Sequence, residues 1–145
     1  IMRLQEPTKK MSKSDENVNA FIAILDDEDT IIRKFKRAIT DSEAEVVYRE
    51  GKDGINNLMN IYSAVTGKSF QEIEFEFSGC GYGKFKPAVG EAVIETLRPI
   101  REEAARILAD KAYLESVYKA GAEKASYTAA KTLRKVYKKV GFLPR

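Results

Sequence analysis

The chain has 145 residues, of which 43% are hydrophobic and 32% are charged, so it is long enough to fold around a core of its own. The sequence has no histidine, which excludes Ser-His catalytic triads, histidine general bases and histidine metal ligands. A single cysteine, Cys80, excludes an internal disulfide and fits a reducing cytoplasm, and no apolar run approaches the roughly 18 residues that predict a membrane span.

The charges are unevenly distributed along the chain. Residues 111–145 hold nine Lys and Arg residues against two glutamates, a net charge of +7, which leaves −4 on residues 1–110 for the overall +3. A basic segment beside an acidic body indicates contact with a polyanion. A solvated helix face would explain the same pattern equally well.

The first elements predicted are a strand and a loop. Residues 1–5 have the pattern of the end of a buried strand, and Pro7 favours extended backbone before it. Asp15 and Glu16 favour a helix amino-terminus through the helix dipole. Residues 20–25 are apolar throughout, and periodicity does not decide between a short strand and a buried turn.

A first amphipathic helix is expected next. Acidic residues 26–29 suit a helix amino-terminus, and apolar side chains then recur at helical spacing through residues 31–39. Residues 40–42 should end this helix. The polar, glycine-punctuated stretch 43–53 is predicted to be a loop.

A second and a third helix follow that loop. Apolar residues recur at helical spacing between positions 55 and 65, and Gly67 is suited to the carboxyl-terminus of this helix. The capping-box pattern Ser69-Phe70-Gln71-Glu72 predicts a third helix from about residue 70. Residues 73–77 alternate as in a strand, but the capping box favours a short helix there.

The glycines within residues 79–83 raise one alternative, a phosphate-binding loop after a strand. Their spacing is G-x-G-x-G rather than G-x-G-x-x-G, and no second strand follows at the distance that a βαβ unit needs. These residues favour a tight turn, with Cys80 as a small buried hydrophobe.

The rest of the chain has helical periodicity. An apolar stripe runs through residues 85–108, and Pro99 should bend or break this helix near residues 95–96. The pattern continues to Gly121, and a last basic helix ends at Gly141. The chain is therefore predicted to be all-α, a helical bundle with a residual strand at its start.

Residues 8–15 concentrate groups that suit a phosphate. Lys10 and Lys13 are three residues apart, so in a tight turn both ammonium groups can reach one anion. Ser12 and Ser14 add hydroxyl donors and backbone amides. Such a loop can stabilise charge that grows on a phosphoryl group, although many short basic runs are only solvated turns.

The string Lys10-Met11-Ser12-Lys13-Ser14 matches in full the KMSKS signature of class I aminoacyl-tRNA synthetases. Its flanks and several later blocks resemble the carboxyl-terminal third of bacterial tryptophanyl-tRNA synthetases. The later blocks are Leu25-Asp26-Asp27, Ala38-Ile39-Thr40-Asp41-Ser42, Asn57-Leu58-Met59-Asn60-Ile61-Tyr62, Gly81-Tyr82-Gly83, Phe85-Lys86 and Glu95-Thr96-Leu97-Arg98-Pro99-Ile100. The resemblance covers essentially the whole chain.

This resemblance implies ATP-dependent activation of tryptophan and its transfer to tRNA(Trp), in the cytoplasm. It implies that Lys10 and Lys13 are catalytic lysines that meet the ATP phosphates, that Mg²⁺ binds with ATP, and that the chain holds no metal of its own. Ile1 would present backbone to the adenine. The implied ATP-binding residues are Ile1, Lys10, Met11, Ser12, Lys13 and Ser14.

The resemblance also implies two parts. Residues 1–17 would end a nucleotide-binding domain, and residues 18–145 would form an anticodon-binding, helical carboxyl-terminal domain. The tryptophan pocket would lie outside this chain, so the segment is expected to be inactive alone, whereas the full-length protein would be a homodimer with no membrane segment. Expected RNA phosphate contacts are Lys131, Arg134, Lys135, Lys138 and Lys139.

Two alternatives stay open. One is the tyrosine-specific relative of the same synthetases, and the other is a non-catalytic helical RNA-binding module.

Overall fold

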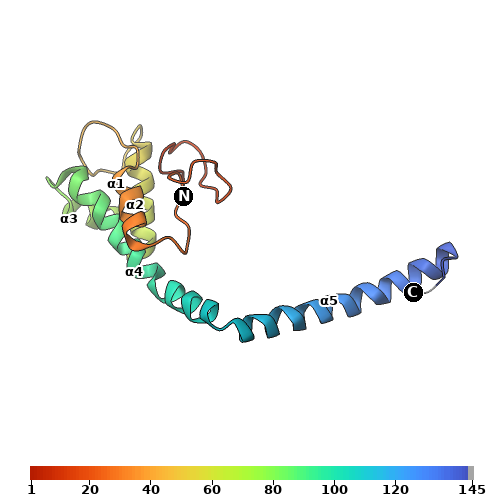
Figure 1. The fold of residues 1–145 in the computed structure, drawn as a ribbon. Coiled ribbons are helices and arrows are strands. Elements are labelled where there is room, and N and C mark those ends of the chain that lie inside the picture. The colour runs from red at the N-terminus through yellow and green to blue at the C-terminus, as the bar shows by residue number, and fades with distance from the viewer. Residues whose placement is uncertain (144–145) are drawn as a thin grey trace. The chain divides into compact units, whose positions relative to one another are not determined.

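The structure is a computed structural model that describes residues 1–143. Five α-helices and no strand lie within these residues, which confirms the predicted all-α class (Figure 1). The chain divides into two compact units, Ile1–Arg101 and the remainder from Glu102 onward. In the described part of the chain, no helix combines the length and apolar character that crossing a bilayer requires.

Helix α1 spans Glu28–Lys36 and begins where the acidic residues predicted it. The carboxylate of Asp27 accepts a hydrogen bond from the amide of Thr30 at 2.7 Å, which satisfies one open donor of the first turn. The helix ends earlier than residues 40–42, the end that the sequence predicted. The reason is a distant contact, because the amide of Ile39 donates to the carbonyl of Leu4 at 2.8 Å instead of to the helix.

Helices α2 and α3 agree with the sequence. Helix α2 spans Asp53–Thr66 and ends at Gly67, whose φ of 75° is left-handed and suits glycine. Helix α3 spans Phe70–Glu76, and the capping box between Ser69 and Glu72 is present in both directions. The strand-like alternation of residues 73–77 therefore falls on a helix, with Ile73 fully buried.

Helix α4 spans Gly81–Ala109 and is not broken at Pro99, where the sequence predicted a bend or a break. Proline removes one backbone hydrogen bond, and the remaining bonds of a long helix hold the turns on either side. Helix α5 spans Lys111–Val140 without the predicted interruption at Gly121, because an interior glycine costs only about 1 kcal/mol. It ends at Gly141 as predicted, and no residue of α5 is buried.

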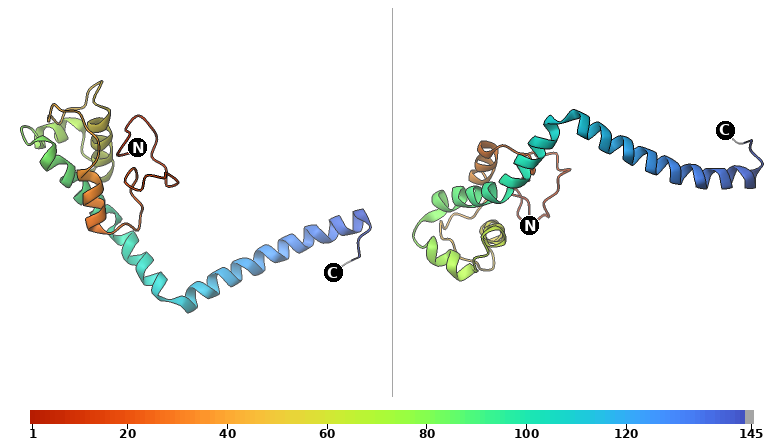
Figure 2. Two further views of the ribbon diagram at one scale, coloured as in Figure 1. Left: turned by 45° about the horizontal axis from the view of Figure 1, so that its top comes forward. Right: turned by 90° about the horizontal axis from the view of Figure 1, so that it is seen from below.

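The first unit has a core to which α1, α2, α3 and α4 contribute. Its largest fully buried side chains are Leu4, Ile31, Phe35, Ile55, Leu58, Met59, Ile73, Phe85 and Val89. Leu4 comes from the non-helical start of the chain, and its amide donates to the carbonyl of Ala20 at 2.9 Å. The core therefore anchors the irregular segment 1–26, drawn in red in Figure 2.

Two expectations for this first segment were wrong in detail. Residues 1–5 form a single antiparallel bridge, between Met2 and Lys10, rather than a strand. No helix follows Asp15, whose carboxylate accepts from the amide of Asn17 at 3.0 Å and pairs with Arg3; bends and a turn follow instead. Residues 20–25 are also turns, and only Ala20 among them is buried.

Candidate functional site

The signature loop, defined here as residues 10–14, is held at its beginning by a short antiparallel contact. The amide of Met11 donates to the carbonyl of Ile1 at 3.2 Å, and the amide of Arg3 donates to the carbonyl of Lys9 at 2.8 Å. Met2 and Lys10 therefore lie opposite each other. This contact sets the register of Lys10.

An ion pair holds the other end of the signature loop. The Nε of Arg3 lies 2.8 Å from Oδ2 of Asp15, whose side chain is only 9% exposed. Arg3 also lies 3.3 Å from the carboxylate of Glu6. The same short segment that pairs with the start of the loop thus also pairs with the residue directly after it.

Between these two ends the backbone makes a tight turn. The amide of Asp15 donates to the carbonyl of Ser12 at 3.3 Å, and the hydroxyl oxygens of Ser12 and Ser14 lie 3.0 Å apart. Met11 is half-buried and packs against the core of the first unit. A loop anchored by one apolar side chain and two backbone contacts presents its remaining side chains to solvent.

The two signature lysines are exposed, and within residues 1–143 neither makes an ion pair or a hydrogen bond. The neighbouring Lys9 is different, because its Nζ lies 2.7 Å from the carboxylate of Glu6. Lys10 and Lys13 are therefore available to an anionic ligand. Two ammonium groups on one tight turn can neutralise charge on adjacent phosphate oxygens.

A second group of charged residues in the first unit, the Lys52 cluster, has the opposite character. It consists of Asp41, Glu43, Lys52 and Tyr82. The side chain of Lys52 is only 3% exposed, and its Nζ lies 2.8 Å from Glu43 and 3.4 Å from Asp41. The hydroxyl of Tyr82 donates to Asp41 at 2.6 Å. This cluster joins the loop before α2 to the start of α4.

The pKa values in the Lys52 cluster follow from these contacts. Burial alone would lower the pKa of Lys52, but its hydrogen bonds with Glu43 and Tyr82 outweigh burial and raise that pKa above its ordinary value. Burial alone would raise the pKa of Asp41, but the hydroxyl of Tyr82, the amide of Glu43 and Lys52 lower it overall. At neutral pH Asp41, Glu43 and Lys52 are therefore ionised and Tyr82 is neutral, and the single cation is held by carboxylates of the same cluster, which indicates a structural role.

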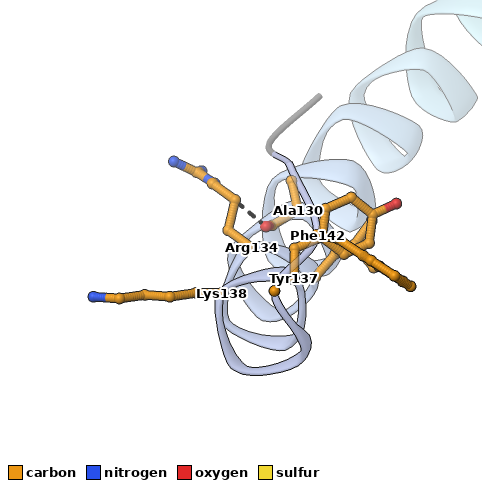
Figure 3. Close-up of a pocket in the computed structure, with 7 residues that line it drawn as sticks. Ala130, Arg134, Tyr137, Lys138 and Phe142 are labelled. Atoms are coloured by element: carbon orange, nitrogen blue, oxygen red, sulfur yellow. Dashed lines mark hydrogen bonds between the residues drawn. The ribbon is translucent and has the colours of Figure 1, made fainter.

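Helix α5 carries the basic residues for which RNA contacts were expected. All five are exposed, and they are Lys131, Arg134, Lys135, Lys138 and Lys139. A hollow of about 660 Å³ lies at this end. Figure 3 shows the side chains of Arg134 and Lys138 extending to one side of this hollow. The rings of Tyr137 and Phe142 lie on the other side, in an edge-to-face contact with 5.8 Å between the ring centroids.

Sequence reasoning missed three sets of contacts in the first unit. Two of them hold the signature loop, namely the Arg3–Asp15 ion pair and the two hydrogen bonds between the side chain of Asn57 and the backbone of Met2. The third is the Lys52 cluster. The block 57–62 contributed to the family resemblance, but nothing in the sequence connected Asn57 with Met2.

Comparison with known proteins places the chain in a family. The family model for class I tRNA synthetases (W and Y) matches residues 1–98. The chain belongs to this family. The family resemblance inferred from the signature is therefore confirmed.

The similar relatives of this class I synthetase chain are tryptophan–tRNA ligases. Those from Clostridium tetani and Clostridium acetobutylicum are 53% and 50% identical to it over 143 residues, which is 99% of this chain and 42% and 43% of the relatives. The crystal structure of tryptophanyl-tRNA synthetase from Campylobacter jejuni matches with a TM-score of 0.75 at 26% identity, over 98% of this chain and 44% of that one. The enzyme from Mycoplasma pneumoniae matches with a TM-score of 0.66 at 28% identity, over 99% and 46%. The chain thus spans less than half the length of these relatives.

Proposed function

We propose that the chain is the part of a tryptophan–tRNA ligase that supplies the KMSKS loop and the tRNA-binding helices. The observation that carries this proposal is a complete signature on a loop fixed at both ends, with Lys10 and Lys13 exposed and, in the part of the chain that the structure describes, unpaired. Relatives about half identical to the chain, all named tryptophan–tRNA ligase, support tryptophan as the amino acid.

The reaction that we propose is attack of the tryptophan carboxylate on the α-phosphoryl group of ATP, with pyrophosphate as the leaving group. Such a step depends on positioning and charge neutralisation. Lys10 and Lys13 are the proposed catalytic residues, which would neutralise the phosphate charge that passes to pyrophosphate. Mg²⁺ would be bound to the ATP phosphates rather than to residues of this chain.

The remaining ATP contacts come from the loop and its base. Ser12 and Ser14 offer hydroxyl and amide donors to phosphate oxygens, and Met11 fixes the loop to the core. Ile1 is 67% exposed and would offer backbone to the adenine. Since the loop is attached at two ends, it can close on the nucleotide as a unit.

The proposed organisation of the ligase assigns residues 1–17 to the end of the nucleotide-binding domain and residues 18–145 to the helical tRNA-binding domain. The exposed lysines and arginine of α5 would contact tRNA phosphates. The tryptophan pocket would lie in the part of the ligase that this chain does not span. We further propose that the full-length ligase is a homodimer of the cytoplasm.

The test is ATP–pyrophosphate exchange by a full-length ligase that carries this segment. Exchange should depend on tryptophan, and tyrosine should not replace it. The 145-residue chain alone should give no exchange, because it would lack the tryptophan pocket. Exchange that depends on tyrosine, or exchange by the chain alone, would contradict the proposal.

A non-catalytic RNA-binding module is the second candidate, favoured by the basic charge of α5. Its signature would be binding of generic RNA that weakens steeply with salt and does not respond to ATP. A full-length protein that behaves in this way and activates no amino acid would replace the ligase proposal with this one.

A further inference from the structure

The backbone N–H and C=O of Met2 make no hydrogen bond with the signature loop. In an antiparallel pair, two residues that face each other without mutual hydrogen bonds direct their N–H and C=O groups away from the partner strand. Met2 and Lys10 are such a pair, because the bonds of the contact run from Met11 to Ile1 and from Arg3 to Lys9. The N–H and C=O of Met2 therefore need another partner.

The side chain of Asn57 is that partner. The amide of Met2 donates to Oδ1 of Asn57 at 2.8 Å, and Nδ2 of Asn57 donates to the carbonyl of Met2 at 2.9 Å. Asn57 lies on α2 and is only 3% exposed. Its side-chain amide thus takes the place that the peptide group of a third strand would occupy.

These bonds connect α2 with the signature loop through one residue. Asn57 fixes Met2, and the backbone on either side of Met2 fixes Lys9 and Met11, which flank Lys10. Because α2 is packed in the core through residues such as Leu58, it provides a rigid reference for the loop.

We propose that Asn57 is a positioning residue, which acts through Met2 to hold Lys10 in register for the phosphates of ATP. This inference rests on the proposed ligase function. Loss of the Asn57 side chain leaves two partly buried backbone groups of Met2 without protein partners, so the contact at the base of the loop loosens. A displacement of about 1 Å in a positioned group can cost about a hundredfold in rate.

The adjacent Asn56 offers a matched control. Its Oδ1 accepts from the amide of Arg49 at 3.2 Å, and its Nδ2 donates to the carbonyl of Arg49 at 2.7 Å. Both asparagines therefore clamp one backbone residue to the same helix. Only the Asn57 clamp reaches the base of the signature loop.

The experiment compares Asn57→Ala with Asn56→Ala in a full-length ligase that carries this segment, with active sites counted by the burst of adenylate formation. Asn57→Ala should lower kcat of ATP–pyrophosphate exchange about ten- to a hundredfold, with KM for tryptophan unchanged. Asn56→Ala should stay within about twofold of the parent. Lys10→Ala combined with Asn57→Ala should be little worse than Lys10→Ala alone, because both changes remove the same interaction.

A second measurement does not depend on catalysis. In the 145-residue chain, Asn57→Ala should speed hydrogen exchange at the amides of Arg3 and Met11, whereas Asn56→Ala should leave both unchanged. Unchanged exchange at these amides, or a kcat loss that is equal in the two variants or fully additive with Lys10→Ala, would overturn the role of Asn57. If Lys10→Ala itself leaves adenylate formation intact, the ligase mechanism proposed for the loop is wrong instead.

Discussion

The signature loop and the Lys52 cluster use the same side chain for opposite purposes. Lys52 is buried, and its charge is balanced by Glu43 and Asp41. Lys10 and Lys13 are exposed, and the described residues offer them no carboxylate. A buried ammonium group without such partners would be strongly destabilising, whereas an exposed one on an anchored loop remains available for a ligand.

This difference shows how the fold separates stability from chemistry. Among the Lys and Arg residues of the described segment 1–15, Arg3 is paired with Asp15 and Lys9 with Glu6. The two unpaired lysines of this segment are the two that the KMSKS signature specifies. This distinction would fail if a paired lysine were needed for the reaction with ATP, or if an unpaired lysine were needed for the stability of the fold.

The largest expected effect is on adenylate formation. Lys13→Ala in a full-length ligase should lower the rate of ATP–pyrophosphate exchange about 10²–10³-fold, because one donor to the transition-state charge is lost. Tryptophan binding and the thermal midpoint should change little. Lys9→Ala, at the residue directly before the signature loop, is the matched control, and it should reduce exchange far less because Lys9 is paired with Glu6. Equal losses in the two variants would remove the distinction between paired and unpaired lysines.

A smaller effect, on stability alone, is expected at Lys52. Lys52→Met removes charge-assisted hydrogen bonds worth about 1.5–3 kcal/mol and leaves Asp41 without its cation, whereas Glu43 keeps its ion pair with Arg49. Urea unfolding of the 145-residue chain should show this loss. Lys68→Met is the control, since Lys68 pairs with Glu76 at the surface and should contribute far less. Similar losses at both sites would mean that the Lys52 cluster is no more than a surface pair.

The smallest effect is on the pH dependence of stability. Burial and the hydrogen bond with Asp41 raise the pKa of Tyr82, and the pKa of Lys52 is also raised. The contributions of both groups to the free energy of unfolding are therefore complete below about pH 10 and decline above it. The pKa of Asp41 is lowered, so its contribution is present above about pH 4 and declines as the pH falls.

Thermal melts between pH 3 and 11 should therefore show a plateau that declines on both sides. Lys52→Met should remove the Lys52 part of the alkaline decline and leave the Tyr82 part, and Asp41→Asn should flatten the acidic decline. If both variants keep both declines of the parent profile, the declines belong to other groups.

Local signals in the sequence predicted the local structure. The capping box at Ser69 and the glycine at position 67 specified helix ends through contacts within a few residues. The early end of α1 was not predictable in this way, because it depends on a bond between Ile39 and Leu4, 35 residues apart in the chain. Helices α4 and α5 continue through Pro99 and Gly121, although proline removes a backbone hydrogen bond and glycine is a poor helix former.

The candidate site was predictable to a similar extent. The five-residue signature identified Lys10 and Lys13, and their exposure follows from a polar turn. The anchoring of the loop was hidden, since Asn57 and Met2 are 55 residues apart and an asparagine in a helix carries no sign of its partner. Residue type alone also does not show that Lys52 is buried and paired whereas Lys13 is exposed and available to a ligand.

One measurement compares both kinds of lysine in a single sample. A full-length ligase that carries this segment is acylated briefly with a lysine reagent, with and without ATP and Mg²⁺, and the modified sites are quantified by mass spectrometry. Lys10 and Lys13 should react quickly and be protected by ATP, whereas Lys52 should react slowly in both conditions. If ATP binds and neither Lys10 nor Lys13 is protected, the signature loop does not hold the nucleotide and the proposed mechanism is wrong.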